Sequence, residues 1–130
     1  MIQKRIVLGS KSPRRQELLA GIGIEFTIRT KDTDESYPEN LNPLEVPIYI
    51  AKNKANALIE GLDVNEIIIC ADTVVIVDTT ILGKPNNKKE AIEMLQLLSG
   101  KTHLVTTGVV IGSSTKQLHL QQLLKSLLKT

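Results

Sequence analysis

The stretch IIICADTVVIV at residues 67–77 decides the fold, because two aliphatic runs in it meet directly at Asp72 and Thr73. Near-continuous apolar runs of this length are typical of strands buried in a sheet, so we expect one long strand through the pair. A buried carboxylate is costly unless a cation, a metal ion or hydrogen-bond donors meet it. The alternative is a bulge or strand end at which Asp72 bonds to the backbone.

Strands and helices alternate on both sides of this stretch. Further strands are predicted near residues 5–9, 24–30, 81–83 and 102–111, from their apolar, β-branched and alternating patterns. Helices are predicted after three cap-like positions, Ser12, Asn42 and Asn87, with Pro47 as either a kink or the true start of the second helix. This order indicates an α/β fold, in which a mixed sheet carries flanking helices.

Composition narrows the class of protein. A chain of 130 residues is one domain, and its net charge of +2, with two Tyr and one Phe, excludes a non-specific nucleic-acid binder. The single cysteine, Cys70, lies in an apolar run and is predicted to be a small buried side chain rather than a nucleophile. One cysteine fits a reducing cytosol, and we expect a cytoplasmic protein, with neither a signal peptide nor a membrane-spanning stretch.

The segment LGSKSPRR at residues 8–15 places two arginines in the first turn of a predicted helix. The helix macrodipole disfavours positive charge there and favours a bound anion. A strand, a Gly/Ser turn and a helix with free N–H groups, together with the forks of Arg14 and Arg15, form a predicted phosphate site. The alternative is a pair of solvated surface charges.

Other charged positions become informative in combination. Lys54 and Lys84 are each most simply solvated, and the acidic loop with Asp34 and Glu35 offers oxygen ligands of the kind that Mg²⁺ prefers. Cations on three elements could gather a polyphosphate, while carboxylates on two others hold a metal ion and direct a water molecule. This set of groups is suited to cleaving a phosphoanhydride.

Five segments, in order, resemble the Maf family of septum-formation inhibitor-like nucleoside triphosphate pyrophosphatases: SKSPRRQELL, DTDE, AKNKA, CADTVVIVDTTILGKP and AIEMLQLLSGKTHLVTTGV. The resemblance implies an elongated, ITPase-like α/β fold with a groove between two lobes. It also implies metal-dependent hydrolysis of a nucleoside triphosphate to the monophosphate and pyrophosphate. SPRR followed by ADTVV is closer to the branch that prefers dTTP and UTP.

The same resemblance assigns roles to individual residues. Asp72 is implied to be the catalytic carboxylate and, with Glu35, a ligand of Mg²⁺ or Mn²⁺. The residues implied to bind the substrate are Ser10, Arg14, Arg15, Lys54, Thr73 and Lys84.

The family pattern stops after Ile111, so we expect an incomplete Maf-like domain over residues 1–118 and an unrelated tail over 119–130. Codons allowed for this tail, read two bases later, spell Phe-Thr-Thr-Thr-Thr-Glu-Val-Thr-Phe-Glu, which is the strand the family has there. We therefore hypothesise a frameshift near codon 119. The alternative is an amphipathic helix with a leucine stripe.

The missing segment is expected to leave an edge and apolar surface uncovered, which favours a homodimer. Two other functions stay open at this point. One is a non-catalytic remnant that binds nucleotides or polyphosphate, and the other is a protein-interaction module linked to septum formation.

Overall fold

The computed structural model describes residues 4–82, 87–115 and 117–128. Within these ranges, none of the helices has both the length and the apolarity that a bilayer crossing requires. The elements follow the chain in this order: β1 (Arg5–Leu8), α1 (Pro13–Gly21), β2 (Phe26–Ile28), the 3-10 turn η1 (Pro43–Glu45), α2 (Val46–Ile59), β3 (Glu66–Val77), β4 (Thr80–Leu82), α3 (Lys88–Leu98), β5 (Lys101–Gly112) and β6 (Gln117–Leu128).

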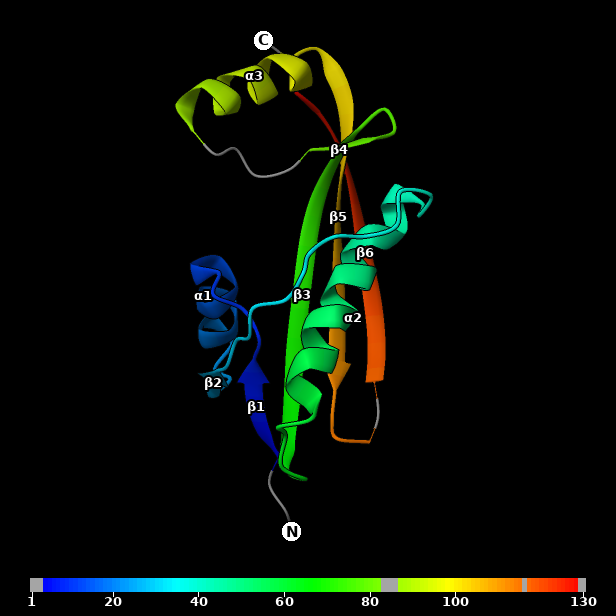
Figure 1. Ribbon diagram of the computed structural model, residues 1–130. Helices are drawn as coiled ribbons and strands as arrows, with labels where there is room; N and C mark the ends of the chain where they lie inside the picture. The colour runs from blue at the N-terminus through cyan, green and yellow to red at the C-terminus, as the bar shows by residue number, and fades with distance from the viewer. Residues whose placement is uncertain (1–3, 83–86, 116, 129–130) are drawn as a thin grey trace.

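The strands form one mixed sheet in the order β2-β1-β3-β5-β6, and β4 pairs with β3. β1 runs parallel to β2 and β3, whereas β4 and β5 run antiparallel to β3. The long strands β3 and β5 give the molecule its elongated shape, with α3 and β4 at one end and α1, β1 and β2 beside the other half (Figure 1). The predicted α/β class and elongated fold are confirmed.

β3 passes through the Asp72–Thr73 pair without a bulge, as the aliphatic pattern predicts. Its register with β5 is continuous from Ile68 opposite Gly112 to Val77 opposite His103. Because β5 occupies one edge of β3 over this whole length, β1 and β4 must share the other edge. β1 pairs there with the first residues of β3 and β4 with the last, so among the described residues no strand pairs with that edge at Asp72 and Thr73.

Helix α2 covers β3 and β5 across this break (Figure 1). It begins at Val46 with Pro47 in its first turn, after a 3-10 turn whose cap, Asn42, accepts from the Leu44 N–H at 3.0 Å. The proline therefore starts the helix rather than kinking it. Two clusters of buried apolar residues join α2 to the sheet, one on each side of Asp72: Val7, Ala51, Ala55, Leu58, Ile68, Cys70 and Val110, and Val46, Ile50, Val74 and Ile76.

Cys70 belongs to the first cluster and is fully buried. Loss of hydration raises the pKa of its thiol to about 11, despite the opposing charge of Lys54. A thiol of this kind stays protonated at neutral pH and is a poor nucleophile. The prediction that Cys70 is a small core residue is confirmed.

The loop that follows β2 is fixed to the sheet at its start. Arg29 donates its backbone N–H to the Leu8 carbonyl at 3.1 Å, and its guanidinium forms two hydrogen bonds to the buried Glu66 carboxylate at 3.1 and 3.0 Å. Arg29 holds the pKa of Glu66 below its ordinary value, with the Asp63 N–H adding to the effect. This anchor sets the direction in which residues 30–35 leave the sheet.

Residues 117–128 form β6, an antiparallel partner of β5 along its full length. The amphipathic-helix alternative for the tail is therefore wrong. The unpaired edge of β5 offers a row of backbone donors and acceptors, and pairing with them satisfies the tail's own backbone groups. The frameshift near codon 119 stays a prediction.

Gly108 sets how closely α2 approaches the sheet. It lies opposite Asp72 in the register, and a Cβ atom there would be 2.5 Å from the Ile48 backbone nitrogen and 2.7 Å from the Pro47 carbonyl carbon. Backbone atoms cannot rotate away as a flexible side chain can. Any residue larger than glycine therefore requires the helix and the strand to separate.

We expect Gly108→Ala to lower the free energy of unfolding by about 1–3 kcal/mol, the usual cost of overpacking a core. Urea denaturation followed by far-ultraviolet circular dichroism measures the change. Gly21→Ala is the matched control, because nothing lies within 4 Å of a Cβ at that position. Equal stability of the two variants would contradict the steric account.

Candidate functional site

The turn after β1 places the first site residue against the open edge of β3. The Gly9 N–H donates to the Ile69 carbonyl at 2.9 Å, and a Cβ at Gly9 would lie 2.6 Å from the Cys70 sulfur. Glycine is needed here because the backbone approaches the core so closely. The next residue, Ser10, is thereby only 7% exposed.

Hydroxyl groups organise the start of α1. The Ser12 side chain accepts from the Arg15 N–H at 3.5 Å, which confirms Ser12 as the helix cap. The Ser10 Oγ accepts from the Ser12 N–H at 3.1 Å and from Arg15 Nη1 at 3.4 Å. Arg15 Nη2 donates to the Thr73 Oγ1 at 3.2 Å. The guanidinium thus spans from the turn to the open edge of β3.

The two arginines of the SPRR segment differ in their surroundings. Arg14 is exposed and lines neither of the hollows described below, whereas Arg15 is partly buried. In the described part of the chain, no carboxylate forms an ion pair with Arg15. Neutral hydroxyls therefore orient its charge without neutralising it, and that charge is available to an anion.

Asp72 meets a cation on the other face of the sheet. Alternation along β3 puts Asp72 on the α2 face with Cys70 and Val74. Lys54 of α2 places its Nζ 3.5 Å from Asp72 Oδ1 and 3.1 Å from Glu35 Oε1. The Asp72 and Lys54 side chains are 17% and 21% exposed, and that of Glu35 is 63% exposed. Lys54 is therefore the charged partner that a carboxylate in this partly buried position needs.

Burial controls the protonation of Asp72. Loss of hydration raises its pKa above the ordinary value, and the nearby Glu35 charge raises it further. Lys54 and Arg15 act in the opposite direction. A carboxylate with a raised pKa is a better proton acceptor than a free one, which suits a general base.

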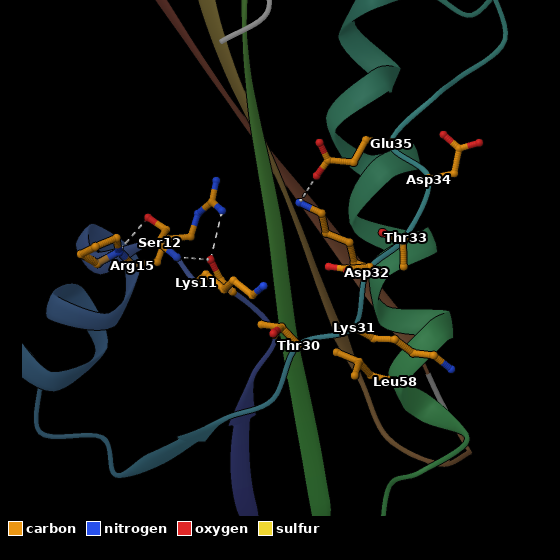
Figure 2. Close-up of a pocket in the computed structure, with 14 residues that line it drawn as sticks. Lys11, Ser12, Arg15, Thr30, Lys31, Asp32, Thr33, Asp34, Glu35 and Leu58 are labelled. Atoms are coloured by element: carbon orange, nitrogen blue, oxygen red, sulfur yellow. Dashed lines mark hydrogen bonds and ion pairs between the residues drawn. The ribbon is translucent and has the colours of Figure 1, made fainter. Parts of the chain in front are cut away.

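Thr73 points to the opposite face from Asp72. There it receives Arg15, and its Oγ1 lies 2.9 Å from the Thr107 Oγ1 of β5, its direct partner in the register. The site therefore straddles the edge of one strand, as Figure 2 shows with Arg15 and Glu35 on either side of β3. Sequence reasoning missed Thr107. The polar pair inside the apolar strand at residues 102–111 was the available signal.

A hollow of about 790 Å³ adjoins these groups. It lies between the turn at residues 9–13, the loop at residues 30–35 and α2 (Figure 2). Its charged lining residues are Lys11, Arg15, Lys31, Asp32, Asp34, Glu35 and Lys54. Sequence reasoning did not single out Lys11, Lys31 or Asp32 as site residues. A second hollow of about 520 Å³ extends from Asp72 and Thr73 toward β4 and α3, and Glu35 lines both.

The acidic groups offer few places for a metal ion. Across the described ranges, no three His, Cys, Asp or Glu side chains gather as a metal-binding group. Asp34 accepts from the Ser36 N–H at 2.9 Å, and this bond lowers the pKa of Asp34. Glu35 and Asp72 remain, joined through Lys54. The structure thus brings together Ser10, Arg15, Lys54, Thr73, Asp72 and Glu35, while Lys84 lies outside the described residues.

Comparisons with known proteins agree with the sequence motifs. Residues 5–127 match the family model described as Maf-like protein. Relatives named dTTP/UTP pyrophosphatase occur in Bacteroides thetaiotaomicron, 46% identical over 114 residues, and in Porphyromonas gingivalis, 51% identical over 111 residues. The aligned parts cover 87% and 83% of this chain but 59% and 56% of those relatives. The chain therefore spans little more than half of their length.

Solved structures share the fold at low sequence identity. The Staphylococcus aureus Ham1 protein matches with a TM-score of 0.68 at 14% identity, over 94% of this chain and 70% of that one. A nucleoside-triphosphatase, dITP/XTP pyrophosphatase, from Mycobacterium abscessus matches with a TM-score of 0.56 at 13% identity, over 93% and 72%. These matches establish a common fold.

Arg15 and Arg14 should differ as anion ligands. We expect Arg15→Ala to weaken binding of inorganic tripolyphosphate by about tenfold or more, because a hydrogen bond to a charged group contributes about 1.5–3 kcal/mol. Arg14→Ala should weaken tripolyphosphate binding by only about twofold, since an exposed charge is screened. Isothermal titration calorimetry measures both. Equal losses would contradict the distinction between the two side chains.

Proposed function

The chain belongs to the family of Maf-like proteins, and on this premise we propose that it hydrolyses dTTP or UTP to the monophosphate and pyrophosphate. The names of the relatives support this reaction and this substrate class. One observation carries the proposal. Neighbouring residues of β3 hold an arginine that no described carboxylate neutralises, through Thr73, and a partly buried carboxylate, Asp72.

The start of α1 provides the phosphate site in this proposal. The Arg15 guanidinium and the Ser10 hydroxyl line the hollow at the start of α1, where the helix dipole favours an anion. Preorganised donors of this kind stabilise the charge that develops on phosphate oxygens as the anhydride bond breaks. A bound anion then explains why positive charge is found at a helix N-terminus.

Asp72 acts as the proton acceptor. A water oxygen forms a bond to phosphorus, the anhydride P–O bond breaks, and the bonding electrons leave with the departing phosphate oxygen. The water proton passes to an Asp72 carboxylate oxygen. Lys54, which contacts Asp72 and Glu35, keeps Asp72 charged and oriented despite its burial.

We also propose that Glu35 and Asp72 hold a divalent cation, Mg²⁺ or Mn²⁺. The donor set fits, because Mg²⁺ is commonly held by one or two carboxylates and completes its shell with water and substrate phosphates. Glu35 Oε1 and Asp72 Oδ1 lie 3.1 and 3.5 Å from the same Lys54 Nζ, so the two carboxylates are close to each other. When bound, the cation would neutralise phosphate charge.

A non-catalytic polyphosphate binder is the second candidate, because Arg15, Ser10 and the α1 N-terminus form an anion site without any help from Asp72. A protein-interaction module linked to septum formation is the third. The following experiments separate these functions.

We expect Asp72→Asn to lower pyrophosphate release from dTTP and UTP by about 10²- to 10⁴-fold, the usual contribution of a general base. Affinity for tripolyphosphate should stay the same or rise, since a negative charge is removed. Steady-state assays and calorimetry measure the two quantities. A parent chain that binds tripolyphosphate but releases no pyrophosphate is a binder, and one that does neither favours the interaction module.

Chelation should test the metal. Addition of EDTA is expected to abolish pyrophosphate release, and excess Mg²⁺ or Mn²⁺ should restore it. Glu35→Gln should raise the metal concentration needed for half-maximal rate by about tenfold while leaving the fold intact, because Glu35 is mostly exposed. Full activity in EDTA would overturn the proposed role of the cation.

A further inference from the structure

Thr107 lies on β5, the strand next to β3, and contacts the candidate site only through Thr73. It stands opposite Thr73 in the register, and the two hydroxyl oxygens are 2.9 Å apart. Thr107 is partly buried and lines neither hollow. Its hydroxyl therefore does not touch a ligand in those hollows and can act only through Thr73.

The hydrogen-bonding capacity of Thr73 fixes the direction of this contact. A guanidinium can only donate, so the Thr73 Oγ1 must accept from Arg15 Nη2 at 3.2 Å. A hydroxyl has one proton and two lone pairs. If Thr107 donates to the second lone pair, the proton of Thr73 remains free for a phosphate oxygen. If Thr107 instead accepts, the proton of Thr73 is used in the Thr73–Thr107 hydrogen bond and is not available to a phosphate oxygen.

Arg15 depends on this contact because its other side-chain partner is weak. Its second side-chain hydrogen bond, to Ser10 Oγ, is 3.4 Å long, and no described carboxylate forms an ion pair with it. A long, flexible arginine held by two neutral oxygens loses its direction when one oxygen rotates away. The orientation of the Thr73 hydroxyl thus controls the orientation of the Arg15 fork.

We propose that Thr107 is a positioning residue for the triphosphate site, donating to Thr73 so that Thr73 holds Arg15 and keeps its own proton for a phosphate oxygen. The inference rests on the proposed function for the identity of the ligand. It extends the site through a chain of three side chains that come from β5, β3 and α1.

The test uses substitutions that separate hydrogen bonding from packing. Thr107→Val removes the hydroxyl and keeps the shape, Thr107→Ser keeps the hydroxyl, and Thr27→Val on exposed β2 is the matched control. We expect Thr107→Val to weaken tripolyphosphate binding and to raise KM for dTTP about three- to tenfold, with kcat within twofold. Thr107→Ser and Thr27→Val should both stay within twofold of the parent.

A double-substitution cycle decides whether the effect passes through Thr73. In a Thr73→Val background, Thr107→Val should change tripolyphosphate affinity by less than twofold, because the contact is already absent. An undiminished loss in that background, or no rescue by Thr107→Ser, would overturn the proposal and leave Thr107 a packing residue.

Failure of the proposed function gives a different pattern. A parent chain that binds tripolyphosphate but hydrolyses no nucleotide refutes the enzyme, while the binding cycle still decides the role of Thr107. A parent that does not bind tripolyphosphate overturns the positioning role as well, because there is then no triphosphate site to position.

Discussion

The open edge of β3 is the constraint on which the rest of the site depends. One long strand is paired with β5 from Ile68 to Val77 on one side, and with β1 and then β4 on the other, and the described residues leave a gap between those two. A gap in pairing exposes backbone and side chains of a strand that is otherwise buried. Asp72 and Thr73 occupy it, so two polar residues can stand in an otherwise aliphatic strand and still contact polar partners.

Because side chains alternate along β3, the polar groups of the candidate site lie on two faces of the sheet. Asp72 meets Lys54 and Glu35 beside α2, while Thr73 meets Arg15 and Thr107 on the other face. The two cationic side chains have different partners: Lys54 forms ion pairs with carboxylates, and Arg15 donates hydrogen bonds to hydroxyls. A charge that must bind an anion is best oriented by neutral groups, because a carboxylate partner would compete with the ligand.

Glycine lets the supporting layers come close enough to hold this arrangement. Gly9 allows the turn before α1 to lie against Cys70, and Gly108 allows α2 to lie against β5 directly opposite Asp72. The same architecture occurs in the Ham1 protein at 14% identity. The fold therefore tolerates extensive change in sequence, whereas the candidate site consists of a few polar side chains at the break in the strand edge.

The sequence by itself determined the elements and most of the candidate residues: a strand through Asp72, a helix capped by Ser12, and a buried Cys70 all follow from local patterns. Tertiary structure alone decided that Arg15 rather than Arg14 faces the hollow, that Thr107 contacts Thr73, and that residues 117–128 form a strand instead of a helix. The reason is physical. Capping and periodicity depend on near neighbours, but the Arg15–Thr73 and Thr73–Thr107 contacts join residues 58 and 34 positions apart, whose meeting depends on strand register and helix packing.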